Sequence, residues 1–312
     1  MRPGGIRRPV RRSGDATGIE SMKLVLLIAM SFPLCAQIDL SGSWAARNYG
    51  LAEGQSGMVD YVGVPLNESA RERALLYSAS EVSEPDRQCS VWSPVYLMSG
   101  NFGLKIWNET EPLSGRTIAW KIGPWEDLAV TTIWMDGRSH PSNNAPHDIG
   151  GFTTGVWEND VLTTYTTHMP AGLYRKNGVP SSPQATMRLS FLRHGDILTL
   201  SARIEDPVYL AEPLYVTRTF QWSQGPPIPM AAIPCIPAEE GVPVGAVPHY
   251  LPGKNPFLGE MQRLYNIPPQ TALGGPETMY PDYRKKLKDT YVIPDRCKLQ
   301  CGGSGNAPLK TN

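Results

Sequence analysis

The sequence predicts a mainly β protein, because about nine short segments alternate apolar and polar residues or are rich in β-branched and aromatic residues. Phe102, Leu104 and Ile106 share one face of such a segment, and Ile118 and Trp120 share one face of the next. We expect strands at 42–47, 102–108, 116–122, 130–135, 152–157, 161–167, 187–193, 197–204 and 214–222. Turn-forming residues separate these segments, which favours an antiparallel sandwich or a closed barrel.

Local signals also predict two hairpin turns and one helix. Asn159-Asp160 and His194-Gly195-Asp196 have the composition of tight turns between strands. Within 65–77, Asn67 is a good N-cap and Glu68 suits the first turn of a helix. The charged face of this segment predicts a surface helix, so we expect a helical insertion near 65–78 in a β domain that spans 37–224.

The last part of the chain has a different composition, since about half of the thirty prolines fall between 226 and 308. Proline cannot donate to a sheet ladder, so this part is unsuited to interior strands. We expect a proline-rich arm over 225–312, with short helices near 258–265 and 283–289 and a disordered end.

The first 36 residues are typical of a leader with a secretory signal peptide, because a lysine precedes a short apolar run that ends at the small residue Ala36. The run is about half as long as a bilayer span, so no permanent membrane span is expected. Met22 is the expected true start. A twin-arginine signal is less favoured, because the arginine pairs lie far from the apolar run, and Leu34 before Cys35 argues against lipidation. We expect a periplasmic or extracellular protein.

Charge and motifs exclude several classes of function. Removing the six basic and two acidic residues of the leader from the 29 of each sign leaves 23 and 27, so the rest is mildly acidic and has no basic stripe for nucleic acid. No phosphate-binding glycine loop and no Gly-x-Ser-x-Gly motif is present, so we expect neither a cofactor nor a serine hydrolase. A metal site from His140, His147 and a carboxylate is the less favoured option, since nothing fixes its ligands.

Four cysteines remain after cleavage, and an even number in an exported protein favours disulfides. Three pairings of Cys89, Cys235, Cys297 and Cys301 are possible. Short spacing favours Cys297 with Cys301, which leaves Cys89 with Cys235.

The start of the first strand and the end of the last one resemble lipocalin-like (calycin) barrels. Gly42-Ser-Trp44 has the Gly-x-Trp pattern of that family, and Arg218 is placed like the family's arginine on the final strand. The resemblance implies an up-and-down barrel of about eight to nine strands, with Trp44 as the floor and Arg218 packed over its indole. The alternative is an ordinary buried Trp44 and a solvent-facing Arg218.

The central segment resembles a family of exported bacterial proteins of unassigned function, through an Asp-Gly-Arg-x-His-Pro pattern followed by Gly-x-Thr-x-Gly-x-Trp-Glu-x-Asp-x-Leu and a later Asp-Pro. The matching residues are Asp136, Gly137, Arg138, His140, Pro141, Gly151, Thr153, Gly155, Trp157, Glu158, Asp160, Leu162, Asp206 and Pro207. This resemblance supports the fold and export, and it implies no reaction.

The same segment carries the candidate catalytic residues. His140 titrates near neutrality and can act as a general acid or base, with Asp136 or Glu158 to orient it. The candidate ligand contacts are Arg138, Trp134, Trp157 and Asp160. The structural alternative is a turn, in which Asp136 bonds its own backbone, Gly137 supplies positive φ and Arg138 pairs with Glu158.

Three functions follow from these observations. The first is a barrel that binds a small, mostly apolar molecule, since about eight strands can enclose one ligand. The second is a barrel enzyme, such as an isomerase, cyclase or hydrolase, that uses His140 with Asp136 or Glu158. The third is a structural or interaction protein of the envelope. A filled interior favours the third function, whereas an open apolar interior favours the first and His140 inside the barrel favours the second.

Overall fold

A computed structural model describes residues 38–47, 61, 63–78, 93–99, 103–124, 130–175, 177–224, 247 and 249–293. These residues belong to one compact unit that spans Ile38–Asn312. The predicted leader of residues 1–36 and the predicted disulfide partners Cys89, Cys235, Cys297 and Cys301 lie outside the described residues.

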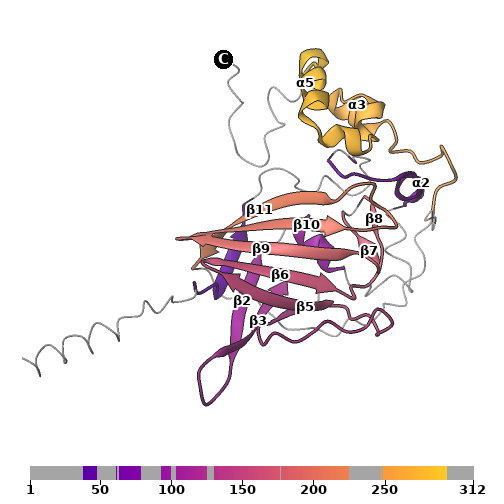
Figure 1. Ribbon diagram of the computed structural model, residues 1–312. Helices are drawn as coiled ribbons and strands as arrows, with labels where there is room; N and C mark the ends of the chain where they lie inside the picture. The colour runs from indigo at the N-terminus through magenta and orange to yellow at the C-terminus, as the bar shows by residue number, and fades with distance from the viewer. Residues whose placement is uncertain are drawn as a thin grey trace, which may run out of the picture. The chain divides into compact units, whose positions relative to one another are not determined.

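Nine strands of the described chain form a closed barrel (Figure 1). Around the wall the order is β1-β11-β10-β9-β6-β5-β4-β3-β2, which closes because β1 also pairs with β2. The strands are β1 (Gly42–Ala46), β2 (Leu104–Thr110), β3 (Thr117–Pro124), β4 (Thr131–Trp134), β5 (Phe152–Glu158), β6 (Val161–Thr167), β9 (Thr186–His194), β10 (Ile197–Glu205) and β11 (Leu214–Ser223). The predicted mainly β barrel is confirmed, and each predicted strand corresponds to one of these nine.

One neighbouring pair departs from the all-antiparallel expectation. β4 and β5 are parallel, and their register comprises two residue pairs in the described chain, Ile133 with Thr153 and Trp134 with Thr154. A parallel pair needs a connection that returns to the starting end. Residues 135–151 make this return without a helix or strand, and we call them the crossover.

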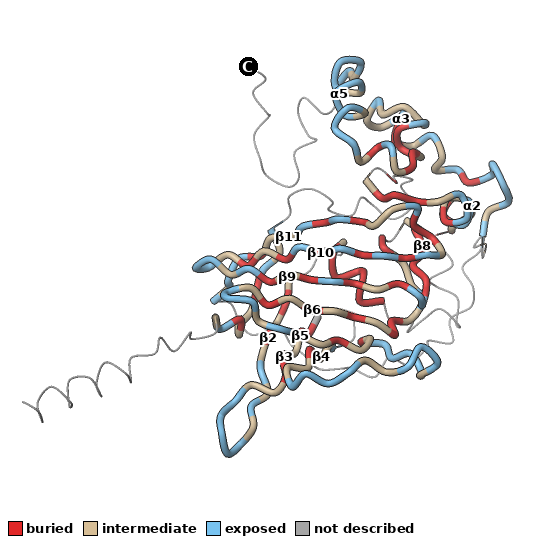
Figure 2. Tube along the Cα trace, in the orientation of Figure 1, coloured by how far each residue is buried: buried red, intermediate tan, exposed pale blue. Residues whose placement is uncertain are grey.

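Alternation along the strands separates the two faces of the wall, as Figure 2 shows for β9 and β10. The alternate residues Met187, Leu189 and Phe191 of β9 are buried. Their cross-strand neighbours Ala202 and Leu200 on β10 are buried as well. Inward side chains therefore form one apolar core, which the alternation in the sequence predicts.

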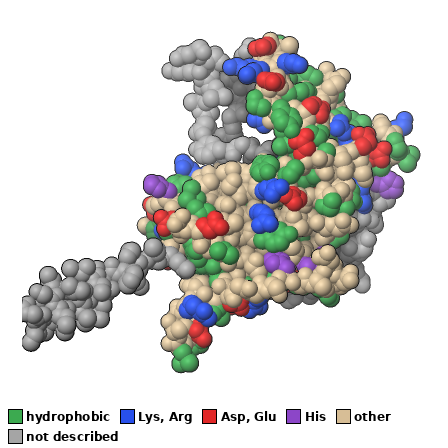
Figure 3. Space-filling model, in the orientation of Figure 1, with side chains coloured by type: hydrophobic (Ala, Val, Ile, Leu, Met, Phe, Trp, Pro, Cys, Tyr) green, Lys and Arg blue, Asp and Glu red, His purple; other side chains and the backbone are tan. Residues whose placement is uncertain are grey.

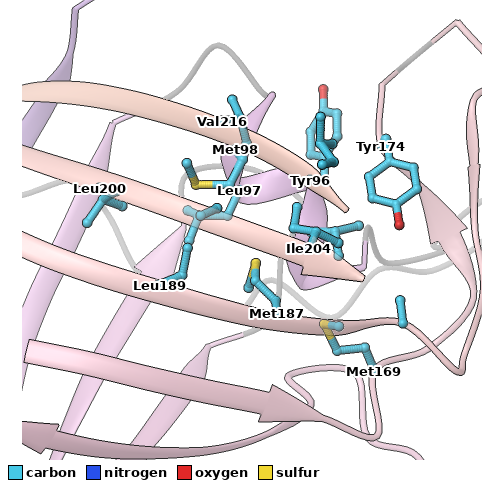
Figure 4. Packing of buried hydrophobic residues seen from close by; sticks show 14 of the residues in the cluster. Tyr96, Leu97, Met98, Met169, Tyr174, Met187, Leu189, Leu200, Ile204 and Val216 are labelled. Atoms are coloured by element: carbon cyan, nitrogen blue, oxygen red, sulfur yellow. The ribbon is translucent and has the colours of Figure 1, made fainter. Parts of the chain in front are cut away.

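A segment that the sequence analysis did not predict fills part of the interior. The 3₁₀ helix η2 (Pro94–Met98) has all five residues buried. Figure 4 shows its Tyr96, Leu97 and Met98 among inward side chains of the wall, such as Leu189 and Leu200. The Arg218 Nη1 donates to the Leu97 carbonyl at 2.5 Å, which ties β11 to this segment. We call residues 93–99 the plug.

The other described helices lie outside the wall. α2 (Glu68–Leu76) is the predicted helix, and the Asn67 side chain caps it by accepting from the Ala70 backbone N–H at 3.0 Å. The later helices are α3 (Glu260–Tyr265), α4 (Pro269–Ala272), η3 (Pro276–Met279) and α5 (Pro281–Thr290). The Arg71 Nη1 donates to the Leu273 carbonyl at 2.5 Å and joins α2 to this group. None of the described helices combines the length and apolar content needed to cross a bilayer.

One end of the barrel, where β9 ends, is closed by the segment that precedes β1, by Trp44 and by an arginine. Trp44 is fully buried, and its Nε1 donates to the Leu40 carbonyl at 3.0 Å. The guanidinium over the Trp44 ring is that of Arg193, at 5.1 Å from the centroid, and Arg193 also donates to the Asp39 carbonyl. At this distance the contact is a cation–π interaction.

The expected pairing of Trp44 with Arg218 is therefore corrected. Trp44 lies opposite Trp222, and Arg218 is four residues earlier on β11, about 13 Å away along the strand. Arg218 instead lies over the Phe220 ring at 4.8 Å and holds the plug. The Gly-x-Trp motif predicted that the Trp44 indole is buried. Which arginine lies over this indole depends on strand register, and it is Arg193.

Candidate ligand site inside the barrel

The inner wall of β3, β5 and β6 carries buried polar atoms that have no hydrogen-bond partner in the described structure. They are the indole Nε1 atoms of Trp120 and Trp157 and the Thr164 hydroxyl. Trp120 and Thr164 are 3% and 2% exposed, so the burial concerns nearly the whole residue. Trp157 is partly buried, but its Nε1 is buried and its ring packs against the core.

Strand register explains why these side chains point inward. Trp157 lies opposite the fully buried Leu162, and Thr164 lies opposite Gly155 two residues before Trp157. Trp120 lies opposite the buried Ile133 on β4. All of these residues have the inward parity of their strands, so the unpartnered atoms lie on the inner wall and not on the surface.

A neighbouring pair of threonines shows what a satisfied arrangement looks like on the same wall. The hydroxyls of Thr153 on β5 and Thr166 on β6 are 2.8 Å apart, and both residues are buried. Leaving a buried hydroxyl or N–H unpaired costs about 1–3 kcal/mol. The two indoles and Thr164 therefore need an explanation that Thr153 and Thr166 do not.

The sequence candidates His140, Asp136 and Glu158 are not brought together. His140 lies on the outer wall, where its Nδ1 is 2.8 Å from the Thr167 hydroxyl and its Nε2 is 2.9 Å from the Thr154 hydroxyl. Its ring packs against those of Phe152 and Tyr165, at centroid distances of 4.9 and 5.0 Å. Figure 3 shows histidine side chains at the surface over β5 and β6.

The carboxylates of the predicted acid–base set have other positions. Asp136 accepts from the Arg138 side chain at 2.9 and 2.5 Å and from its backbone N–H at 3.2 Å. This pairing lowers the pKa of Asp136 to about 2. Glu158 is exposed at the end of β5, four residues and about 13 Å along the strand from Thr154. His140 therefore has no carboxylate partner among the described residues, and the predicted set is corrected.

The predicted ligand contacts divide between the two faces of the wall. Trp134 points outward, and the Arg138 guanidinium stacks on its ring at 3.6 Å, so the pairing of Arg138 is with Asp136 and Trp134 and not with Glu158. Asp160 lies in the β5–β6 turn, where Asn159 has φ of 55°. Among these candidates, Trp157 is the residue whose ring packs against the core of the barrel. The turn at Asp136 has the predicted form, with φ of 75° at Gly137.

The other histidines of this region anchor the crossover. The His168 Nε2 is 2.9 Å from the Ser142 carbonyl, and the His147 Nδ1 is 2.8 Å from the Met169 carbonyl. Because carbonyls only accept, both nitrogens carry a proton. Within the described residues no group of three or more histidine, cysteine, aspartate or glutamate side chains is placed to hold a metal ion.

A buried carboxylate that the sequence analysis did not single out as a site residue closes the other end of the barrel. Asp206 is 3% exposed and accepts from the Ser182 backbone N–H and hydroxyl at 2.8 and 2.7 Å, and from the Tyr209 N–H at 3.2 Å. Burial, followed by the Asp206 charge, raises the pKa of Tyr174 far above its usual range. The Tyr174 hydroxyl donates to Asp206 at 3.2 Å. The signal in the sequence that could have pointed to Asp206 is the Asp206-Pro207 pair just after a predicted strand. The contacts of Asp206 give it a structural role.

Comparisons with known proteins identify no family for this chain. No family model matches it, and no curated protein matches it. Among solved structures, it is similar to a crystal structure of a mutant of the fluorescent protein UnaG, with 7% identity, 60% of this chain and 97% of that chain covered, and a TM-score of 0.27. A score this low supports no functional conclusion. The barrel assignment rests on strand topology, and the resemblance to exported bacterial proteins stays a prediction.

Proposed function

We propose that the protein is an exported barrel that binds a small, mostly apolar molecule bearing hydrogen-bond acceptors. The observation that carries this proposal is the set of unpartnered buried groups on the inner wall, the Nε1 atoms of Trp120 and Trp157 and the hydroxyl of Thr164. An indole N–H only donates, so the ligand atom that meets it must be an acceptor such as a carbonyl or carboxylate oxygen. Export is supported by the leader sequence.

The surroundings favour a ligand that is apolar apart from those acceptors. Leu162 and Ile133 are buried on the same inner wall and offer no polar side-chain atoms. Ligand sites of proteins commonly combine such an apolar lining with a few convergent polar groups. A bound acceptor would remove the cost of the unpaired donors, so binding and stability are coupled in this proposal.

Thr164→Val and Thr153→Val make a matched test. Thr164 has an unpartnered hydroxyl, so Thr164→Val should leave the free energy of unfolding unchanged or raise it, while weakening ligand retention about tenfold. Thr153 has a partner, so Thr153→Val should lower the free energy of unfolding by about 1 kcal/mol and leave retention unchanged. Native mass spectrometry of the exported protein gives the retained ligand, and urea denaturation gives the stability.

The outcomes separate the proposal from its competitor. If nothing copurifies, and Thr164→Val destabilises the protein as much as Thr153→Val does, the hydroxyl has an internal partner and the binding proposal fails. The competitor is a structural or interaction protein of the envelope, which the buried plug favours because it fills part of the interior. The crossover residues His140 and Asp136 are not proposed as catalytic.

A further inference from the structure

The parallel seam between β4 and β5 is the most weakly paired part of the described wall. It has two residue pairs, whereas β10 pairs with β9 through nine. β3, which pairs with β4, carries Trp120, and β5 carries Trp157. The two unpartnered indoles therefore lie on the inner wall on opposite sides of the seam. The crossover leaves β4 and is bound to the β5–β6 side by its histidine contacts.

The direction of each hydrogen bond in these contacts can be deduced from one end. His168 donates from Nε2 to the Ser142 carbonyl, so a neutral His168 has an accepting Nδ1, which the Thr167 hydroxyl fills at 2.8 Å. The Thr167 oxygen then accepts from the His140 Nδ1–H. The His140 Nε2 is left as an acceptor for the Thr154 hydroxyl. The neutral network therefore has one consistent arrangement.

One added proton fits this network. With one added proton on either ring, the His140 Nε2 donates to the Thr154 oxygen, and the Thr167 hydroxyl still shares one hydrogen between the two Nδ1 atoms, so every contact is kept. With a second proton bound, both nitrogens of both rings carry hydrogen. Two imidazolium rings would then face each other across the single Thr167 oxygen, and the Thr167 hydroxyl proton would lose its acceptor.

No carboxylate among the described residues is hydrogen-bonded to the ring of His140 or His168, although charged and titratable groups surround the pair. From β6, Tyr165 packs on the ring, and the Arg188 guanidinium of β9 lies over Tyr165 at 4.4 Å. His147 lies 5.3 Å from His168. On the crossover, the Asp136 carboxylate is paired with Arg138, and Asp148 accepts from the Ile149 N–H. Burial and the neighbouring His168 both lower the pKa of His140.

We propose that His140, Thr167 and His168 form a latch that holds the β4–β5 seam closed with no proton or one proton bound, and releases it with two. The latch joins the chain that leaves β4 to both β5 and β6, so its loss leaves the seam with its two residue pairs. The latch does not depend on the proposed function. Its use as an access route for the ligand does rest on that function.

The test uses ligand-free protein, so it reads the latch even if no ligand exists. Histidine ¹⁵N chemical shifts between pH 8 and pH 4 should show two separate protonation steps for the His140–His168 pair. Hydrogen exchange at the amides of 150–154, corrected for the intrinsic effect of pH, should stay constant through the first step. It should increase at least tenfold through the second. Exchange that is unchanged after both steps, or that accelerates with the first, overturns the proposal.

Two variants and a control locate the effect. His140→Gln cannot carry a proton, so the acceleration at acid pH should disappear. Thr167→Val removes the bridging oxygen, so exchange at pH 8 should already be near the acid value of the wild type. His194→Gln, at an exposed histidine at the end of β9, should behave as the wild type does. An acid step that persists undiminished in His140→Gln rejects His140 as part of the latch.

Discussion

The two halves of the inner wall differ in what fills them. On β9, β10 and β11 the inward side chains are apolar apart from arginines such as Arg218, and the plug packs against them. On β3, β5 and β6 the inner wall includes two indole N–H groups and a hydroxyl without partners in the described structure. Removing packed apolar atoms costs stability, whereas removing an unpaired polar atom does not. The first half therefore maintains the fold, and the second is where we place the ligand.

The largest expected effect is in the apolar half. Phe191 is fully buried on β9, so Phe191→Ala should lower the free energy of unfolding by about 3–5 kcal/mol, measured by urea denaturation. The adjacent Leu192 is 48% exposed, and Leu192→Ala should change that energy by less than about 0.5 kcal/mol. Equal effects at the two positions would mean that the inward parity of β9 is wrong.

Removing the cation that holds the plug should have the next effect. Arg218→Met keeps much of the apolar length of the side chain but leaves the Leu97 carbonyl without this donor, which should cost about 1–3 kcal/mol. Hydrogen exchange at the amides of 95–98 should accelerate, while exchange in β3 should not change. If the β3 amides accelerate equally, the plug supports both halves and the distinction between them disappears.

A substitution at the β4–β5 seam tests how closely side chains pack in the half of the wall that carries the unpartnered polar groups. A Cβ at Gly155 would lie 2.7 Å from the Ile133 side chain and 2.8 Å from the Met135 sulfur, so Gly155→Ala should cost about 1–3 kcal/mol through overpacking. The loss should be visible as a lower midpoint of thermal unfolding. Gly195→Ala introduces a side chain in open space at a turn with φ of 57°, so it tests backbone strain separately from packing.

The smallest expected effect is the dependence of stability on pH. The folded state lowers the pKa of His140. Neutral His140 therefore contributes fully to the free energy of unfolding above its usual pKa of about 6.5, and this contribution declines as pH falls below that value. The pKa of Asp136 is lowered to about 2, so the contribution of the Asp136 carboxylate to the free energy of unfolding is lost only as pH falls from 3.8 toward that value. Stability measured against pH should therefore show two separate declines. His140→Gln should remove the upper one and Asp136→Asn the lower one.

Much of the wall could be predicted from the sequence, because it depends on local patterns. The alternation of Ile118 with Trp120 predicts β3, and Asn67 predicts the start of α2. The parallel β4–β5 pair could not be predicted, because the crossover has no helix to mark a return to the same end. The buried Pro94–Met98 has only one turn of pattern and no amphipathic repeat, so nothing in it indicates a position inside a barrel.

The candidate site was predicted only in part, because side-chain partners depend on faces and register. Trp157 was expected to contact a ligand, and it packs against the core, while Trp134 from the same sequence region points outward. His140 and Asp136 are four residues apart, yet their partners come from β5, β6 and Arg138. Trp120 was predicted only to share one face of a strand with Ile118, and the missing partner of its Nε1 has no signature in a sequence.

The plug also constrains the native connectivity of the barrel. Residues 93–99 lie in the connection between β1 and β2, which are neighbours in the wall. Their connection therefore passes through the inside of the structure that they help to close. Pairing β1 with both β2 and β11 fixes the two ends of this long connection, so the native state bears its loop-closure entropy together with the burial of the plug. The closed barrel and the buried Tyr96 and Met98 therefore belong to one connected arrangement in the native state.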